Sequence, residues 1–223
     1  MTLRHCLSSA AAALVLSVCF LPPAQAQATA APPQRPTSTS YAGDLSIFEE
    51  PNRDQKLQID RVMDILHITR GTAVADIGAG GGWFTVRAAK RVGPEGAVYG
   101  EDINPAAAKA IDARAAKEKL PQVHAVLGTP DDLHLPAPVD FALLLKMYHE
   151  IANPVPLMVK LRASLKPGAR VGIIDRNGNG QDHGLKQSVL EREMREAGYR
   201  KVEHYDFTKE AGEDYFLVFV AAR

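Results

Sequence analysis

A strand-like run, a group of glycines and a helical pattern follow one another in the first half of the chain, and this succession restricts the fold more than any other feature. The run is Ala73–Ile77, the glycine-rich segment is Gly78–Gly82, and the helical pattern is Trp83–Val92. Glycines let the backbone turn tightly and let a ligand approach it closely. The following helix offers free N–H groups and the positive end of its dipole. The segment predicts a nucleotide-type binding site, with a plain flexible turn as the alternative.

Strand-like and helical patterns alternate through the rest of the chain, which predicts a Rossmann-like, doubly wound, mostly parallel seven-stranded sheet of the α/β class. The fully apolar run Phe141–Leu145 is expected to be a central strand. The last two strands, 201–205 and 215–220, are too close in sequence for a helical crossover, so they must be antiparallel. The other expected strands are 97–101, 123–127 and 170–174, and the other expected helices are 53–66, 105–119, 154–165 and 185–197.

The first 26 residues have the pattern of a secretory signal peptide. Arg4 provides a basic start, Ala10–Leu21 is a mostly apolar run, and Ala24-Gln25-Ala26 places small residues where a signal peptidase cleaves. The apolar run is shorter than the roughly 20 residues that a membrane-spanning helix needs. We therefore predict cleavage after Ala26 and export to the periplasm, with an uncleaved anchor or a wrongly assigned start as the alternatives.

Composition restricts the rest of the chain. Residues 27–43 are rich in proline, alanine and hydroxyl side chains, so we predict a flexible linker there and a folded domain over 44–223. Both cysteines, Cys6 and Cys19, lie in the signal segment, so the processed chain would have no disulfide and no thiol nucleophile. Lysine and arginine (26) balance aspartate and glutamate (26), which argues against a dominant charged surface for nucleic acid, so no nucleic-acid partner is indicated, with a local basic patch as the open alternative. No membrane-spanning helix is expected after cleavage, and the sequence does not indicate an oligomeric state.

Two residues near the glycines bear on the kind of ligand. A dinucleotide-binding G-x-G-x-x-G motif has glycine at its sixth position, and this chain has Trp83 there, which argues against NAD. Asp102 ends the second expected strand, where an acidic residue accepts hydrogen bonds from a ribose diol. The alternative is that Asp102 only supplies a negative charge near the start of the next helix.

Five segments resemble the motifs of class I S-adenosylmethionine-dependent methyltransferases, so the chain resembles an exported bacterial-type member of that family. They are VADIGAGGGWFT, VYGEDINPAA, LGTPDDLHLP, DFALLLKMYHEI and LKPGARVGIIDR, and the resemblance extends over about residues 59–220. The first motif and the acid of the second are fairly specific, whereas the later motifs are individually loose. The resemblance implies S-adenosylmethionine as the cofactor.

The family pattern implies roles for individual residues. Asp76 and the backbone of the glycine segment would hold the methionine portion, Asp102 the ribose, and Ile103 the adenine. Asp131 would meet the adenine amine, but the family often has an acid or amide where this chain has Thr129, so the choice between Asp131 and Asp132 stays open. The full set of expected cofactor residues is Asp76, Gly78, Ala79, Gly80, Gly82, Asp102, Ile103, Thr129, Pro130, Asp131 and Lys146.

The methyl acceptor is expected at the carboxyl ends of the strands, where ligands bind in open α/β sheets. Three groups of candidates follow strands or lie in a nearby loop: Tyr148, His149 and Glu150; Asp175; and His183. His149 is a candidate base with Glu150 as its orienting partner, because histidine titrates near neutral pH. The alternative is that His149 only caps the strand. No fixed spacing marks these residues as metal ligands, so no metal is predicted.

We therefore expect a methyltransferase acting on a small-molecule or protein acceptor. A non-catalytic protein of the cell envelope that binds S-adenosylmethionine or a nucleoside is the alternative, because export separates the chain from a cofactor that is made in the cytosol. An NAD-dependent oxidoreductase is a third reading, against which Trp83 stands.

Overall fold

A computed structural model describes residues 35–41, 43–209, 212 and 214–222. The predicted signal peptide and the first part of the predicted linker lie outside these residues. Among the residues that are described, no helix combines the length and apolar character needed to cross a membrane.

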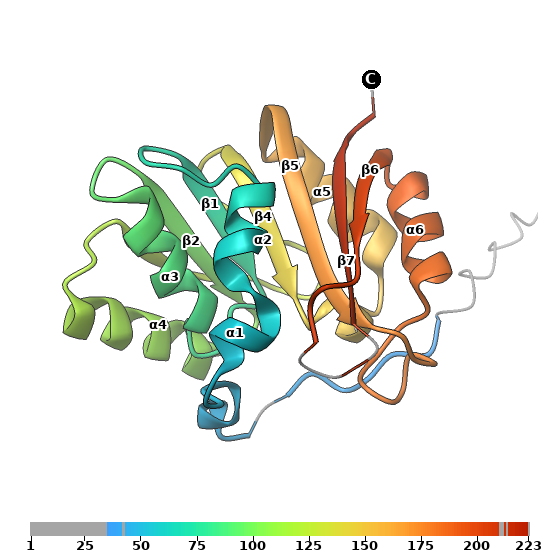
Figure 1. The fold of residues 1–223 in the computed structure, drawn as a ribbon, viewed down its shortest axis with the longest axis horizontal. Helices are drawn as coiled ribbons and strands as arrows, with labels where there is room; N and C mark the ends of the chain where they lie inside the picture. Colours follow the sequence, from blue (N-terminus) through green and yellow to red (C-terminus); the bar gives the residue numbers. More distant parts are fainter. Residues whose placement is uncertain (1–34, 42, 210–211, 213, 223) are drawn as a thin grey trace, which may run out of the picture. The chain divides into compact units, whose positions relative to one another are not determined.

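Seven strands form one sheet in the order β3-β2-β1-β4-β5-β7-β6 (Figure 1). Strands β1 to β5 are parallel, and β7 pairs antiparallel with both β5 and β6. The predicted sheet is confirmed, including the central place of β4 and the antiparallel final pair. The strands are β1 (Ala73–Ile77), β2 (Ala97–Asp102), β3 (Val123–Leu127), β4 (Val139–Leu145), β5 (Leu165–Arg176), β6 (Tyr199–Tyr205) and β7 (Asp214–Ala221).

Helices cover both faces of the sheet (Figure 1). One apolar cluster joins the sheet to α1, α2, α3 and α4, and a second joins it to α5 and α6. The α-helices are α1 (Arg53–Leu57), α2 (Ile59–Ile65), α3 (Trp83–Val92), α4 (Pro105–Glu118), α5 (Pro154–Ala163) and α6 (Gln187–Glu196), and the 3-10 helices are η1 (Leu45–Phe48) and η2 (Tyr148–Glu150).

Successive side chains of a strand point to opposite faces of a sheet. Because helices cover both faces, the central strands have apolar side chains on both. In β4, Leu143 packs into the cluster with α1 to α4, whereas Ala142 and Leu144 pack into the cluster with α5 and α6. Complete burial of a leucine contributes roughly 1.5–3 kcal/mol. The unbroken apolar run in the sequence therefore corresponds to a strand that is buried between two layers of helices.

The predicted single helix 53–66 is wrong, because the chain breaks it at Gln58. That residue has a left-handed backbone (φ 48°, ψ 50°) between α1 and α2, and its side-chain amide donates to the carbonyl of Phe207 at 3.2 Å. Asn52, which precedes α1, is itself left-handed and makes no side-chain capping bond. The break lets Leu57 and Leu66 both reach full burial, which periodicity alone does not reveal.

The order of the strands reverses between β1 and β4, and this point positions the site. Ile77, at the end of β1, lies opposite Glu101 near the end of β2 and opposite Leu144 near the end of β4. The carboxyl ends of the three strands therefore meet at one edge of the sheet, where the helices on either side separate and ligands bind in folds of this class.

Candidate cofactor and acceptor site

A cavity of about 320 Å³ lies at this edge. Its floor is the glycine loop after β1, one wall is the end of β2, and the opposite wall is the segment that follows β4. The roof comes from residues far earlier in the chain, between Ser40 and Arg53. Four segments that are separate in the sequence thus line one cavity.

The glycine loop and Asp102 are in direct contact at the edge of this space. Gly78, Gly80 and Gly82 all have positive φ (67°, 54° and 78°), a conformation that glycine adopts without strain. The Asp102 carboxylate accepts hydrogen bonds from the backbone N–H of Gly80 and of Asn104, each at 2.8 Å. The expected neighbourhood of the loop and the carboxylate is therefore present, with open space beside them.

Asp76, predicted as a cofactor residue, lines the cavity at the end of β1 and is nearly inaccessible. The Thr85 hydroxyl of α3 donates to its carboxyl at 2.6 Å. Burial raises the pKa of Asp76 from 3.8 to about 7, partly offset by the Thr85 bond and by the charge of Arg53. The Asp76 carboxyl group is therefore mainly charged only above about pH 7.

Glu101 is a cavity residue that sequence reasoning missed. It is buried beside Asp102, and burial raises its pKa to about 8, helped by the charge of Asp102. Its Oε1 has no hydrogen-bond partner among the described residues. Gly128 leaves room for this oxygen, since a Cβ at that position would lie 1.9 Å from it. Three carboxyl groups in and around the cavity, one with an unpartnered oxygen, suit a cationic ligand.

Replacing Asp76 with asparagine is expected to stabilise the protein in a pH-dependent way. The folded chain keeps the proton of Asp76 up to about pH 7, whereas the unfolded chain loses it near pH 4, so the wild-type free energy of unfolding falls across that window and is level above it. The change in pKa sets an upper limit of about 4 kcal/mol on the gain above pH 7. Thermal unfolding at pH 5 and pH 8 checks this: the variant's advantage should be larger at pH 8, and equal advantages would contradict it.

The expected adenine side is only partly at the cavity. Ile103 is 41% exposed and lines the cavity together with Thr129 and Pro130. Asp131 is exposed and does not line it, whereas Asp132 accepts from the His134 N–H at 3.0 Å and pairs with Lys160. Asp132 is thus engaged in its own turn, and neither acid faces the cavity.

The roof was not predicted from the sequence. Phe48 and Arg53 line the cavity, and the Arg53 guanidinium donates to the Phe48 carbonyl at 3.0 Å. Trp83 is buried and lines the cavity, and two guanidinium groups lie over its ring, Arg53 at 4.5 Å and Arg87 at 3.9 Å from the centroid. Arg87 in turn forms two hydrogen bonds with Asp54. The bulky ring that argued against NAD therefore anchors α1 over the cavity.

The wall after β4 carries the expected acceptor side. Lys146 has a left-handed backbone (φ 58°), lines the cavity, and pairs with Asp214 at the start of β7. Met147 and Glu150 follow it along the same wall. Burial raises the pKa of Glu150 to about 7, against the lowering effect of the nearby His149.

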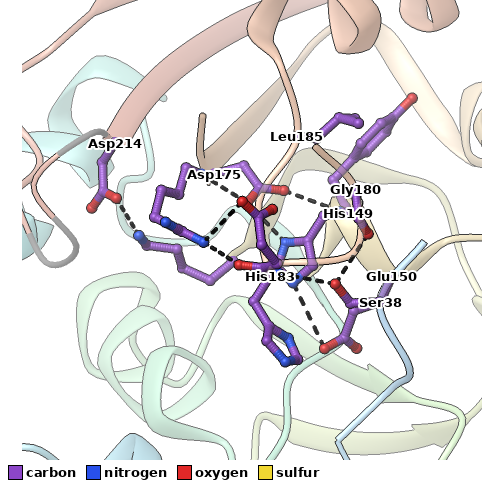
Figure 2. A network of polar contacts seen from close by, with 12 residues as sticks. Ser38, His149, Glu150, Asp175, Gly180, His183, Leu185 and Asp214 are labelled. Atoms are coloured by element: carbon purple, nitrogen blue, oxygen red, sulfur yellow. Dashed lines mark hydrogen bonds and ion pairs between the residues drawn. The ribbon is translucent and has the colours of Figure 1, made fainter. Parts of the chain in front are cut away.

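His149 does not line the cavity and is 3% exposed. Figure 2 shows its ring beside the carboxyl group of Asp175. Its Nδ1 lies 2.9 Å from a carboxylate oxygen of Asp175, and its backbone N–H donates to the other oxygen of Asp175 at 3.1 Å. Its Nε2 lies 3.8 Å from Glu150. The residue that orients His149 is therefore Asp175 and not Glu150 as expected, and Glu150 is the member that reaches the cavity.

The other acceptor-side candidates do not line the cavity. Tyr148 is fully buried in the apolar cluster with α5 and α6, so its predicted contact with the acceptor finds no support in the lining of the cavity. Asp175 is fully buried and contacts Nδ1 of His149. His183 is exposed, in the loop before α6, with its ring centroid 5.8 Å from that of His149.

Residues 35–41 fall in the predicted flexible linker but contact this wall. The Arg35 guanidinium donates to the Tyr148 carbonyl at 2.7 Å and pairs with Glu193 at 3.0 Å. Ser38 is buried, and its hydroxyl donates to the Gly180 carbonyl at 3.1 Å. In the described part of the linker, the chain therefore packs on the domain, which begins nearer residue 35 than residue 44.

Comparison with known proteins agrees with this geometry. Residues 74–168 match the family described as a methyltransferase domain. Nocamycin O-methyltransferase of Saccharothrix syringae is 32% identical over 114 residues, which are 51% of this chain and 41% of that protein. The chain thus matches less than half the length of this curated relative.

Solved structures share the fold. A SAM-dependent methyltransferase from Aquifex aeolicus has a TM-score of 0.70 at 22% identity, over 80% of this chain and 98% of that one. The CcbJ methyltransferase from Streptomyces caelestis has a TM-score of 0.64 at 15% identity, over 83% of this chain and 99% of that one. At these identities the similarity shows the architecture alone.

The residues of the cavity fit the cofactor that this family uses. S-adenosylmethionine carries a sulfonium and an ammonium group, and the cavity has Asp76, Glu101 and Asp102 around a glycine loop. The unpartnered Glu101 oxygen and the raised pKa of Asp76 are the features that a bound cation would relieve. The match of residues 74–168 to a methyltransferase domain, the shared fold and the residues of the cavity all agree with a class I S-adenosylmethionine-dependent methyltransferase.

Proposed function

We propose that the protein transfers a methyl group from S-adenosylmethionine to an oxygen nucleophile of a small molecule, held against the wall that contains Glu150. The observation that carries this proposal is the single cavity with two chemically different walls. Carboxylates and the glycine loop lie on one side, and Glu150 in front of the His149–Asp175 pair lies on the other.

The cofactor supplies an activated methyl group on a sulfonium that leaves readily. Around it, Asp76 and Glu101 would balance positive charge, Asp102 would bind ribose hydroxyls, and Arg53 lies in the roof near Asp76. Because holding two reactants in register can lower a barrier by roughly 7–11 kcal/mol, the enclosure formed by the roof is itself a catalytic asset. It also limits the acceptor to a group that can enter a space of about 320 Å³.

An oxygen acceptor is favoured because the acceptor wall has the means to handle a proton or a negative charge. Glu150 lines the cavity, and His149, fixed by Asp175, lies 3.8 Å behind it. A curated relative that matches half of this chain is named as an O-methyltransferase, which agrees with that chemistry. A protein side chain would have to pass the residues of the roof to reach the same wall.

Two measurements test the proposal. S-adenosylhomocysteine should bind to the purified protein and raise its melting temperature, and labelled methyl groups from S-adenosylmethionine should appear on members of a panel of small phenols, enols and carboxylic acids. Binding without transfer to any compound or extract component would instead support the non-catalytic envelope protein. Absence of binding would overturn the proposal as a whole.

We also propose that the chain is exported to the periplasm and cleaved after Ala26. The support is the basic start, the apolar run Ala10–Leu21 and the small residues at 24 and 26. Mass spectrometry of the protein recovered from periplasmic and cytosolic fractions tests this, since a chain that begins at Gln27 in the periplasm is the expected product. An uncleaved chain confined to the cytosol would contradict it.

A further inference from the structure

The acceptor wall brings together two histidines and a carboxylate that the proposed methyl transfer does not require in combination. One ligand atom from each of His149, Glu150 and His183 lies within 4.8 Å of the other two (Figure 2). The first two residues come from η2, after β4, and the third from the loop before α6. These segments are more than 30 residues apart in the chain, so the arrangement is a product of the fold.

Asp175 holds the ring of His149 in position from the side away from Glu150. Asp175 lies at 2.9 Å from Nδ1 of His149, which leaves Nε2 as the nitrogen that faces Glu150. A carboxylate on the far nitrogen is the usual outer partner of a metal-binding histidine, because it fixes the tautomer and the ring orientation.

His183 is also fixed through its backbone. It has a left-handed conformation (φ 57°), and its N–H donates to the buried hydroxyl of Ser38 at 3.0 Å. The same hydroxyl donates to the carbonyl of Gly180. Ser38 therefore makes hydrogen bonds to two residues of the loop before α6, Gly180 and His183. An exposed histidine is in this way held with its ring near His149.

We propose that His149, Glu150 and His183 form a binding site for a divalent transition-metal ion of the zinc type. Two imidazoles and one carboxylate are a ligand set that holds such ions while leaving a coordination position open. Tetrahedral ligands around zinc are about 3.3 Å apart, so the group must contract from its present spread. Rotation of the exposed His183 side chain provides that movement.

The role of the metal ion in catalysis rests on the proposed function, whereas metal binding can be measured without it. Glu150 lines the cavity, so an ion held by it would lie at the acceptor wall. A metal ion at that place would favour acceptors that offer an oxygen ligand, because coordination to a metal lowers the pKa of a hydroxyl group. Glu150 would then serve as a ligand of the ion.

Metal binding to the chelator-treated protein provides the direct test. Calorimetric titration with Zn²⁺ should give one site with a dissociation constant of about 1 μM or lower, and Co²⁺ should give the visible absorption of a low-symmetry site. His183→Ala should weaken Zn²⁺ binding at least about 100-fold, since it removes one of three ligands. Because His183 is exposed, the variant should keep the wild-type melting temperature, which shows that the loss is local.

A matched control is His204→Ala, which removes another exposed histidine on β6, outside the group. It should bind Zn²⁺ like the wild type. Absence of saturable binding, or wild-type affinity in His183→Ala, would overturn the metal site and leave a hydrogen-bonded network. Binding of S-adenosylhomocysteine, measured on the same samples, reports separately on the proposed function.

Discussion

Replacing Asp102 with alanine is expected to weaken binding of S-adenosylhomocysteine by about 100-fold. The carboxylate would lose its bonds to the ribose hydroxyls, and hydrogen bonds to a charged group are worth about 1.5–3 kcal/mol each. It also accepts from the N–H groups of Gly80 and Asn104, both at 2.8 Å, so the glycine loop would lose the partner that sets its position against β2. Both effects act in the same direction.

Titration calorimetry measures the effect, with Asp112→Asn as the control. Asp112 is an exposed acid on α4, so this variant removes a similar charge away from the cavity and should bind like the wild type. Asp131→Asn should also bind within about threefold of the wild type, since this acid does not line the cavity. An Asp102→Ala protein that is folded and binds within threefold of the wild type would contradict the assignment of the ribose site.

The proximity of the glycine loop and Asp102 could be predicted because its sequence signals are local. The run Ala73–Ile77, the glycines and the helix after them are contiguous, and backbone conformation forces the glycines to appear at fixed places. Asp102 ends the neighbouring strand, and adjacent parallel strands bring their carboxyl ends to one edge. Chain order and strand pairing were therefore enough to bring the carboxylate to the loop.

The roof and the acceptor wall required contacts between distant residues. Nothing near Arg53 or Phe48 in the sequence signals that they cover a cavity whose floor lies some 30 residues later. His149 was expected to be oriented by its neighbour Glu150, but the fold brings Asp175 from the end of β5 to within 2.9 Å. A pairing of this kind depends on the register of β4 against β5, which periodicity does not determine.

Charge was a further gap in the sequence-based prediction. Glu101 is adjacent to Asp102 and was passed over, since alternate residues of a strand point to opposite faces. It nevertheless lines the cavity, because the strand ends there and Gly128 leaves space for its carboxyl group. The raised pKa of both Asp76 and Glu101 is a property of the enclosed space and could not be read from the order of the residues.

Replacing Glu150 with glutamine is expected to lower the turnover number by about 100-fold, within the range of roughly 10²–10⁴ typical of a group that handles a proton. Glutamine keeps the size of the side chain but removes the carboxylate with which the acceptor wall lines the cavity. The loss is expected whether Glu150 meets the acceptor directly or through a bound ion.

The kinetic pattern separates a role in turnover from a role in folding or cofactor binding. Steady-state methyl transfer to an acceptor from the panel should show a reduced kcat, while the affinity for S-adenosylhomocysteine should stay within about threefold of the wild type, because Glu150 lies on the wall opposite Asp102. Glu95→Gln, at an exposed turn, should leave both quantities unchanged. If Glu150→Gln instead lost affinity for S-adenosylhomocysteine in proportion to activity, the carboxylate would contact the cofactor. The acceptor would then have to bind elsewhere around the cavity.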